Sequence, residues 1–405
     1  MLVAACQGGG GATKAKDEPP PKARILVSPA NKSEDVRPEE PITVRAKHGK
    51  LRSVTVTSED DDELKGKFNK ARTKWWSLWP VSPDEEFTVE ATATNVDGRK
   101  TTKTTSFRTL DPEAVIDITS LNLVDDQTVG VGMPIVVKFD KPVFNKKNVE
   151  RSLELRMSEP VKGVWYWANR KELRFRPKEY WPEGNKIEFL AHFNGVRAAE
   201  DTYGVENVSV EFEIGEEHVT TIDTDTHEMT VEESGEVIKT FDISAGKSST
   251  PSPNGTYVAF RKDRMTIMDS ATIGIPKGSP GYYRLEVPYT VKFTFSGIYT
   301  HSMPSTVGAQ GQRNVSHGCI NMAPSAAEWY YDWSQVGDII EVEGTSRELD
   351  MGNGWTDWAR DWEDMLEKSA LGEPVMPEPL ESESPSPSNS QPAKAKKAKA
   401  SPQHS

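Results

Sequence analysis

Short runs of alternating apolar and polar residues constrain the fold of this chain more than any other feature. Such runs occur at residues 25–27, 42–46, 87–93, 172–177 and 208–214, and Pro, Gly, Asn or Asp residues separate them. Alternation with a period of two is typical of half-buried β-strands, and short strands at regular spacing favour β-sandwiches. We therefore predict a mainly β protein.

Composition shifts divide the 405 residues into six segments. Two strand-rich units resemble bacterial immunoglobulin-like modules, and a third all-β unit is expected to have one or two short helices, one of them at 325–333. A helical turn or short helix is also predicted at 148–153 in the second unit. The predicted boundaries are 1–22 (flexible tether), 23–110 and 111–216 (the two immunoglobulin-like sandwiches), 217–345 (the third domain), 346–369 (a Trp-rich helical extension) and 370–405 (a disordered tail).

Two groups of tryptophans stand out. Trp75, Trp76 and Trp79 are predicted to be core or interface residues, with a carbohydrate-stacking platform as the alternative. Trp355, Trp358 and Trp362 recur at i, i+3 and i+7. That spacing predicts one face of a short helix, packed on the third domain.

The overall charge and the first residues restrict the location and partners. A formal net charge of −13 argues against a nucleic-acid partner, whose binding domain would present a basic face. No run of about 18 apolar residues could span a membrane. The segment 3–6 (Val-Ala-Ala-Cys) resembles the lipobox of bacterial lipoproteins, which predicts lipidation at Cys6 and an extracytoplasmic, membrane-anchored protein that faces the cell wall. A chance match is the alternative.

The chemistry-bearing residues gather at 301–321. This stretch contains Cys319, one of only two cysteines, together with His301, His317 and several glycines, but no acidic residue. A lone thiol among histidines in a polar loop is typical of a nucleophilic cysteine. His301 ends a predicted strand (293–300) and lies 18 residues before Cys319, so we assign it as the base and His317 as a supporting pocket residue.

The remaining groups of this site follow from the needs of acyl transfer. Because no carboxylate is near in sequence, a backbone carbonyl such as that of Ser302 is expected to hold the Nδ1 proton of His301. An oxyanion requires fixed donors, which the backbone N–H groups of Gly318 and Cys319 and the phenol of Tyr283 could supply. A buried structural cysteine and half of a zinc site at His317 and Cys319 are the alternatives, but no third metal ligand is near, so no metal is predicted.

The sequence resembles the L,D-transpeptidases with a YkuD-type catalytic domain. The likeness rests on His301 and on the block 316–321 (Ser-His-Gly-Cys-Ile-Asn), and it extends to 268–270, 281–284, 296–297 and 308–311. Two immunoglobulin-like units, a lipobox and a Trp-rich extension make the whole chain similar to the lipoprotein L,D-transpeptidases of actinobacteria.

That resemblance implies an acyl transfer between peptidoglycan stem peptides without a cofactor. Cys319 would attack the third stem residue, release D-alanine and pass the acyl group to a second stem, giving a 3→3 cross-link. His301 would transfer protons, with Ser302 orienting it, and carbapenems would acylate Cys319. The implied substrate contacts are Tyr283, Ser296, Gly297, Ser316, His317 and Asn321.

Some alternatives stay open within this resemblance. An L,D-carboxypeptidase would use the same site with water as the acceptor, and a wall-binding adhesin would leave the cysteine inert. Ser305 stands where close relatives have a Trp, so aromatic cover of the pocket would come from Tyr282 or Tyr299. Residues 23–215 are expected to act as a spacer that the chemistry does not need.

Overall fold

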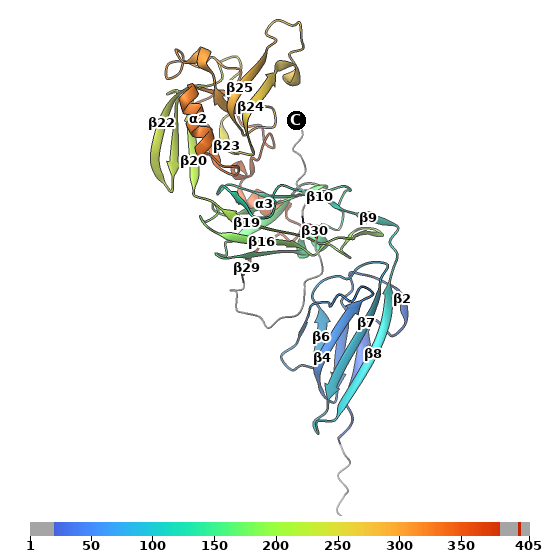
Figure 1. The fold of residues 1–405 in the computed structure, drawn as a ribbon. Helices are drawn as coiled ribbons and strands as arrows, with labels where there is room; N and C mark the ends of the chain where they lie inside the picture. Colours follow the sequence, from blue (N-terminus) through green and yellow to red (C-terminus); the bar gives the residue numbers. More distant parts are fainter. Residues whose placement is uncertain (1–19, 381–395, 398–405) are drawn as a thin grey trace, which may run out of the picture. The chain divides into compact units, whose positions relative to one another are not determined.

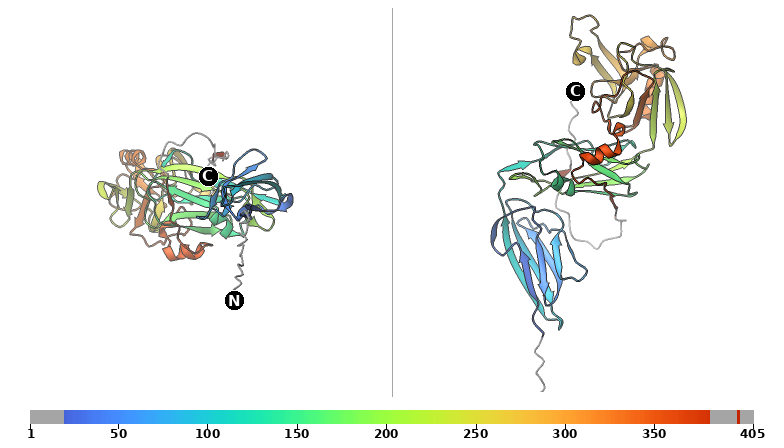
Figure 2. Two further views of the ribbon diagram at one scale, coloured as in Figure 1. Left: turned by 90° about the horizontal axis from the view of Figure 1, so that it is seen from below. Right: turned by 180° about the vertical axis from the view of Figure 1, so that it is seen from behind.

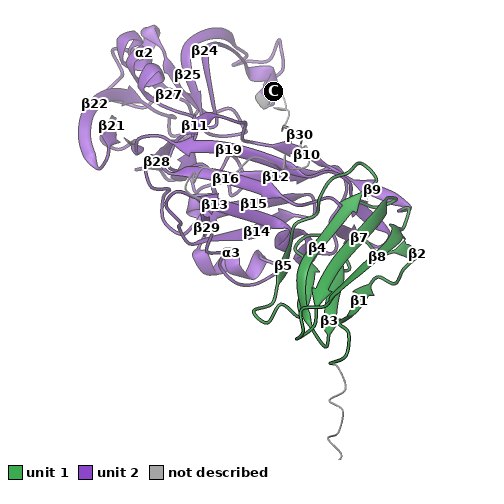
Figure 3. Ribbon diagram, turned by 60° about the horizontal axis from the view of Figure 1, so that its bottom comes forward, with its two compact units in different colours: residues 1–111 green, residues 112–405 purple. Residues whose placement is uncertain are grey.

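The computed structural model describes residues 20–380 and 396–397, and the chain divides into two compact units, 1–111 and 112–405 (Figure 3). Unit 1 is a sandwich of two four-stranded sheets with strand orders β1-β3-β6-β5 and β2-β8-β7-β4. Its strands are β1 (Arg24–Ser28), β2 (Ser33–Val36), β3 (Thr43–Lys47), β4 (Lys50–Ser58), β5 (Gly66–Phe68), β6 (Lys74–Ser77), β7 (Glu86–Thr94) and β8 (Lys100–Thr109).

Strict alternation builds the core of unit 1. In β7, Phe87, Val89 and Ala91 are buried while the residues between them face solvent. The tryptophans of β6 divide in the same way: Trp75 lies in the core, and Trp76 is covered by the ammonium groups of Lys67 and Lys74 at 5.4 and 5.2 Å from its ring. These contacts favour the packing role of this tryptophan pair over a carbohydrate platform.

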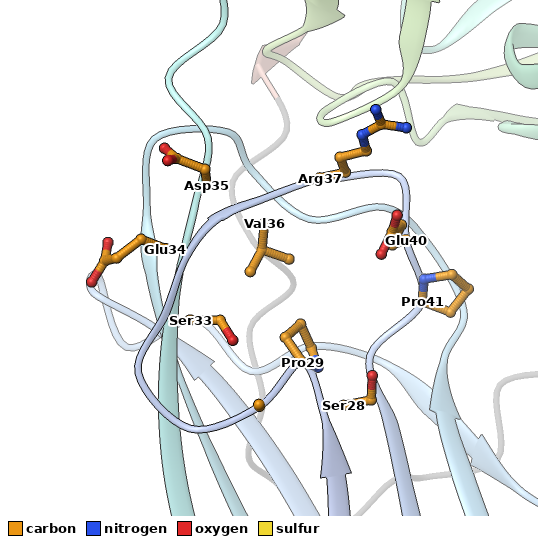
Figure 4. A pocket seen from close by; sticks show the side chains of 10 residues that line it. Ser28, Pro29, Ser33, Glu34, Asp35, Val36, Arg37, Glu40 and Pro41 are labelled. Carbon is orange, nitrogen blue, oxygen red and sulfur yellow. The ribbon is translucent and has the colours of Figure 1, made fainter.

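A hollow of about 370 Å³ lies at one end of unit 1, lined by residues 28–30, 33–37 and 40–41 (Figure 4). Figure 4 shows Val36 and Pro29 facing the hollow and the carboxylates of Glu34 and Asp35 pointing outward. Its lining holds no cysteine or histidine, so it is not the nucleophile site.

Unit 2 begins with a second sandwich. Its sheets have the orders β10-β12-β15-β14 and β11-β19-β16-β13-β29, and β17-β18-β9 forms a small third sheet. The elements are β9 (Ala114–Ile116), β10 (Ile118–Leu121), β11 (Gln127–Val129), β12 (Ile135–Phe139), α1 (Lys146–Arg151), β13 (Leu153–Met157), β14 (Gly163–Asn169), β15 (Glu172–Pro177), β16 (Lys186–Ala191), β17 (Arg197–Ala199), β18 (Thr202–Gly204), β19 (Val208–Ile214), β29 (Glu378–Pro379) and β30 (Lys396–Lys397), which pairs with β19.

The third domain is built on a nine-stranded sheet of order β23-β28-β20-β21-β22-β27-β26-β25-β24, with α2 packed beside β25 and β26 (Figure 1). Pro324 starts α2 at its first position, where a missing N–H has no consequence. The elements are β20 (His218–Asp223), β21 (Glu228–Glu233), β22 (Glu236–Ser244), β23 (Gly255–Val258), β24 (Arg261–Asp269), η1 (Ser270–Ile273), β25 (Arg284–Lys292), β26 (Tyr299–Ser302), η2 (Pro304–Thr306), β27 (Ile320–Met322), α2 (Pro324–Trp333) and β28 (Ile339–Glu343).

The second sandwich and the third domain share a hydrophobic core. Along β23 and the two residues after it, Tyr257 and Ala259 face the core of the third domain, whereas Val258 and Phe260 join the core of the sandwich. Ile339 of β28 joins the sandwich core as well. This packing argues against the expected separation into a spacer and an independent catalytic body, because each domain covers apolar side chains of the other.

The C-terminal extension is not the single helix that the spacing of its tryptophans predicts. Trp355 lies in an isolated bridge to Val258, Trp358 in η3 (Asp357–Ala359), and Trp362 begins α3 (Trp362–Lys368). Trp355 packs against Phe260 of the third domain. Trp358 and Trp362 pack on the second sandwich, where α3 lies over its strands (Figure 2).

A buried ion pair fixes this extension to the sandwich. Asp357 is fully buried, accepts from Arg174 at 2.9 Å and contacts the hydroxyl of Tyr166. The indole N–H of Trp358 donates to the Gly132 carbonyl at 2.8 Å. The structure also differs from the expected tail at 370–405, because residues up to Leu380 pair with the sandwich. Cys6 lies outside the described residues.

Among the helices of the described residues, none is long and apolar enough to cross a membrane.

Candidate functional site

Two short parallel strands bring Cys319 and His301 together. His301 lies in β26 and is paired with Asn321 of β27, while Cys319 directly precedes β27. Residues two apart on a strand share a face, and paired residues of neighbouring strands face the same side. The side chains of Cys319, Asn321 and His301 therefore lie on one face. The predicted strand at 293–300 is wrong, because β25 ends at Lys292 and a turn precedes β26.

The imidazole of His301 is held in one tautomer. It is 2% exposed, and its Nδ1 lies 3.0 Å from the carbonyl oxygen of Ser302, the acceptor expected from the sequence. Because a carbonyl can only accept, Nδ1 carries the proton and Nε2 is left with the free lone pair. Burial lowers the pKa of His301, although the bond to Ser302 opposes this, so the neutral base is favoured at neutral pH.

The thiol of Cys319 is also neutral at rest. It is partly exposed and donates to the carbonyl oxygen of Gly297 at 3.6 Å. Burial raises the pKa of Cys319 to about 11, against a smaller opposing effect of a hydrogen bond from the Tyr299 backbone. With both pKa shifts favouring uncharged forms, the site holds a thiol and an imidazole rather than an ion pair.

Ser316 ties the loop before Cys319 into a fixed turn. Its hydroxyl donates to the Cys319 carbonyl at 2.6 Å and accepts from the Gly318 N–H at 3.0 Å. The Gly318 N–H is therefore occupied, so its expected role as an oxyanion donor is wrong. Among the described residues the Cys319 N–H has no acceptor, and it remains the backbone donor of the site. Gly318 has a φ of +128°, which favours glycine there.

Ser252 is a positioning residue that sequence reasoning missed. Its hydroxyl is buried, donates to the Gly318 carbonyl at 2.7 Å and accepts from the Gly246 N–H at 3.0 Å. The residues Pro-Asn-Gly at 253–255 indicate only a tight turn from sequence. The contact joins residues 66 positions apart, and only the folded sheet brings them together.

Aromatic and basic groups line the approach to the thiol. The ring of Tyr283 lies 5.6 Å from that of His317, between centroids. Burial first, and the charge of Cys319 second, raise the pKa of Tyr283, so its phenol is a donor near the thiol. His317 Nε2 accepts from the ammonium of Lys247 at 3.2 Å, and burial with this cation lowers the pKa of His317. Lys247 was not predicted from sequence. Ser305 is exposed in η2. Burial first, and the charge of Cys319 second, raise the pKa of Tyr299.

The C-terminal extension supports the turn at 293–297, which lies beside Cys319. Asn353 Oδ1 accepts from the backbone N–H of Ser296 at 2.8 Å, and Asn353 Nδ2 donates to the Ser296 hydroxyl at 2.9 Å. The next residue, Gly354, has a φ of +117°, and a Cβ there would lie 2.4 Å from the Phe293 carbonyl oxygen. This close approach fixes the turn that presents the carbonyl of Gly297 to Cys319.

Comparisons with known proteins assign parts of the chain to two domain families. A bacterial Ig domain family matches residues 33–197, and the L,D-transpeptidase catalytic domain family (YkuD) matches residues 217–342. L,D-transpeptidase 2 of Mycobacterium tuberculosis is 34% identical over 368 residues, 89% of this chain and 90% of that protein. L,D-transpeptidase 5 of the same species is 31% identical over 370 residues, 89% of this chain and 80% of that protein. A solved structure of LdtMt1 in complex with imipenem is 37% identical, covers 57% of this chain and all of that chain (100%), and has a TM-score of 0.49.

Proposed function

The chain belongs to the L,D-transpeptidase family of acyltransferases, and we propose that it forms 3→3 cross-links between peptidoglycan stem peptides through a thioester on Cys319. The observation that carries the proposal is the β26–β27 register, which sets the free Nε2 of His301 on the same face as the thiol.

The first half-reaction uses a tetrapeptide stem as donor. As the sulfur of Cys319 attacks the carbonyl carbon of the third residue, diaminopimelate, its proton passes to Nε2 of His301. The Cys319 N–H and the Tyr283 phenol donate to the oxyanion. The imidazolium then gives its proton to the departing amine, and D-alanine leaves as the thioester forms.

The second half-reaction reverses these proton transfers. The side-chain amine of diaminopimelate on another stem attacks the thioester and gives a proton to His301, which returns it to the sulfur. Ser296, Gly297, His317 and Asn321 would contact the two stems. Lys247 is the cation beside this pocket, and in a chain of net charge −13 it is suited to attract a stem carboxylate.

Mass spectrometry of the protein with purified tetrapeptide stems tests this function. We expect a covalent adduct at Cys319 and cross-linked dimers, and neither with Cys319→Ala. Dimers formed by Cys319→Ala would contradict the proposal. Release of tripeptide without dimers would instead identify an L,D-carboxypeptidase, in which water resolves the thioester.

Carbapenems are proposed to acylate Cys319, supported by the LdtMt1 structure in complex with imipenem. A β-lactam carbonyl presents the same electrophile to the thiol as the stem peptide does. We expect one drug-derived mass on the wild-type chain and none on Cys319→Ala, whereas equal labelling of both would place the reaction elsewhere.

A lipid anchor at Cys6, on the outer face of the cell membrane, is the proposed location. It is supported by the lipobox-like residues before Cys6 and the glycine-rich segment after it. Metabolic labelling with a fatty acid should mark the protein when it is expressed with a lipoprotein export signal, and Cys6→Ser should remove the label. Labelling that survives this substitution would contradict the anchor.

Asn353→Ala is expected to lower the rate of Cys319 acylation by about tenfold, which is the effect of losing one or two hydrogen bonds. The Ser296 N–H loses its acceptor, so the Gly297 carbonyl is held less firmly against the thiol. Asn353→Asp keeps an acceptor for this N–H and an oxygen that the Ser296 hydroxyl can donate to, and should restore most of the rate. An unchanged rate in Asn353→Ala, with an unchanged melting temperature, would show that the contact has no role in positioning.

A further inference from the structure

Three possible metal ligands converge where the third domain begins. His218 is the first residue of β20, and it is paired with Glu233, the last residue of β21. Its Nε2 lies 3.6 Å from Glu233 Oε2 and 3.9 Å from Glu216 Oε2. All three donor atoms lie within 4.8 Å of one another.

The imidazole is oriented as metal-binding histidines are. Its Nδ1 lies 3.2 Å from Oδ2 of Asp338, a fully buried carboxylate, and it stacks on Trp333 with 4.0 Å between ring centroids. His218 is only 2% exposed, yet its Nε2 has no hydrogen-bond partner among the described residues. A carboxylate on one ring nitrogen, with the other nitrogen free and aimed at further ligands, is the usual surrounding of a metal-bound histidine.

The distances between Nε2 of His218 and the carboxylates of Glu216 and Glu233 fit a shared metal ion better than a hydrogen bond. At 3.6 and 3.9 Å, neither carboxylate is within hydrogen-bond distance of Nε2. Two donors that each lie about 2.1 Å from one metal are roughly 3.4 Å apart at the tetrahedral angle and cannot exceed about 4.2 Å. Glu233 is itself held by the indole N–H of Trp333 at 2.9 Å, while Glu216 is exposed and free to adjust.

We propose that His218, Glu216 and Glu233 bind one Zn²⁺ ion, with Asp338 and Trp333 orienting the ligands. One imidazole and two carboxylates suit Zn²⁺, whereas Ca²⁺ and Mg²⁺ prefer oxygen ligands alone. The ion would clamp the start of β20 to the end of β21, next to the joint where Asp338 meets Gly130 of the second sandwich. The sequence did not indicate this group, because Glu233 lies 15 residues after His218 and only the pairing of β20 with β21 brings the two together.

Calorimetric titration of the full chain with Zn²⁺ tests the site. Cys6→Ser and Cys319→Ala form the background of every sample, so that neither thiol competes for the metal. We expect one Zn²⁺ per chain and a higher melting temperature with the metal. Glu216→Gln and Glu233→Gln should each weaken binding by at least about tenfold. Both side chains lie at the surface, so these variants should still fold.

Glu228→Gln is the matched control, because Glu228 is exposed at the other end of β21. Its affinity for Zn²⁺ should equal that of the parent. An absence of Zn²⁺ binding, or binding that both ligand substitutions leave unchanged, would overturn the proposal. Displacement of Zn²⁺ by an equal concentration of Ca²⁺ would overturn the assignment to a zinc-type ion.

Discussion

Replacing His301 with Gln is expected to slow the acylation of Cys319 by about 10²–10⁴-fold at pH 7, the usual contribution of a positioned general base. The size of the effect follows from the neutral state of the thiol. With the pKa of Cys319 at about 11, almost no thiolate is present at pH 7, so the proton must be removed during the attack. Single-turnover kinetics with a carbapenem, followed by intact-mass analysis, measures this rate.

The pH dependence of the same rate identifies the base. Burial lowers the pKa of His301, so the imidazole is neutral and able to accept a proton above that pKa. The acylation rate of the wild-type protein should therefore decline only when the pH falls through the lowered pKa of His301, which lies below about 6.5. Above that pKa the rate should not depend on pH. In His301→Gln only the thiolate reacts, so its rate should rise about tenfold per pH unit toward pH 11.

His317→Gln is the control for the pH profile, because His317 accepts from Lys247 and its titration is not needed for proton removal. This substitution should change the acylation rate in the pH-independent region, but not the pH at which that rate declines toward acid. A wild-type rate that rises tenfold per unit between pH 6 and pH 9 would contradict general-base catalysis by His301.

The sequence was enough to propose the reacting residues of the candidate site, but it did not reveal the residues that hold them in place. A rare cysteine, a histidine 18 residues earlier and the absence of nearby carboxylates were enough to indicate the thiol, the base and a carbonyl partner. Sequence reasoning did not identify Ser252 and Asn353, because their hydrogen bonds join residues 66 and 57 positions apart. An Asn before a Gly indicates a turn locally, and only tertiary packing directs its amide to Ser296.

The interface between the second sandwich and the third domain is indicated by the hydrophobic pattern of the sequence. Residues 257–260 and 339–340 are continuous apolar runs, whereas the strands of unit 1 alternate. A strand with both faces buried has no polar face, so an unbroken apolar run predicts cover on two sides. Strands of a sandwich with solvent on one side of each sheet alternate and do not contain such runs. The apolar runs therefore indicate that β23 and β28 lie between two hydrophobic cores.

Removing residues 112–216 together with unit 1 is therefore expected to prevent the third domain from folding, whereas removal of residues 1–111 alone should leave its acylation rate and melting temperature unchanged. Loss of the sandwich would expose Val258, Phe260, Ile339 and Trp355, which are 0–7% exposed in the intact chain. At about 1.5–3 kcal/mol for each buried side chain, their exposure costs roughly 6–12 kcal/mol.

That cost is comparable with the whole stability of a typical domain, about 5–15 kcal/mol. Circular dichroism melting and stoichiometric carbapenem labelling of the two truncated proteins measure the outcome. The shorter deletion is the control, because unit 1 has its own core and contributes no residue to the catalytic site. A cooperative melt and full labelling after the longer deletion would mean that the shared core is dispensable. The expected failure would instead make the second sandwich part of the catalytic body and leave unit 1 as the sole spacer.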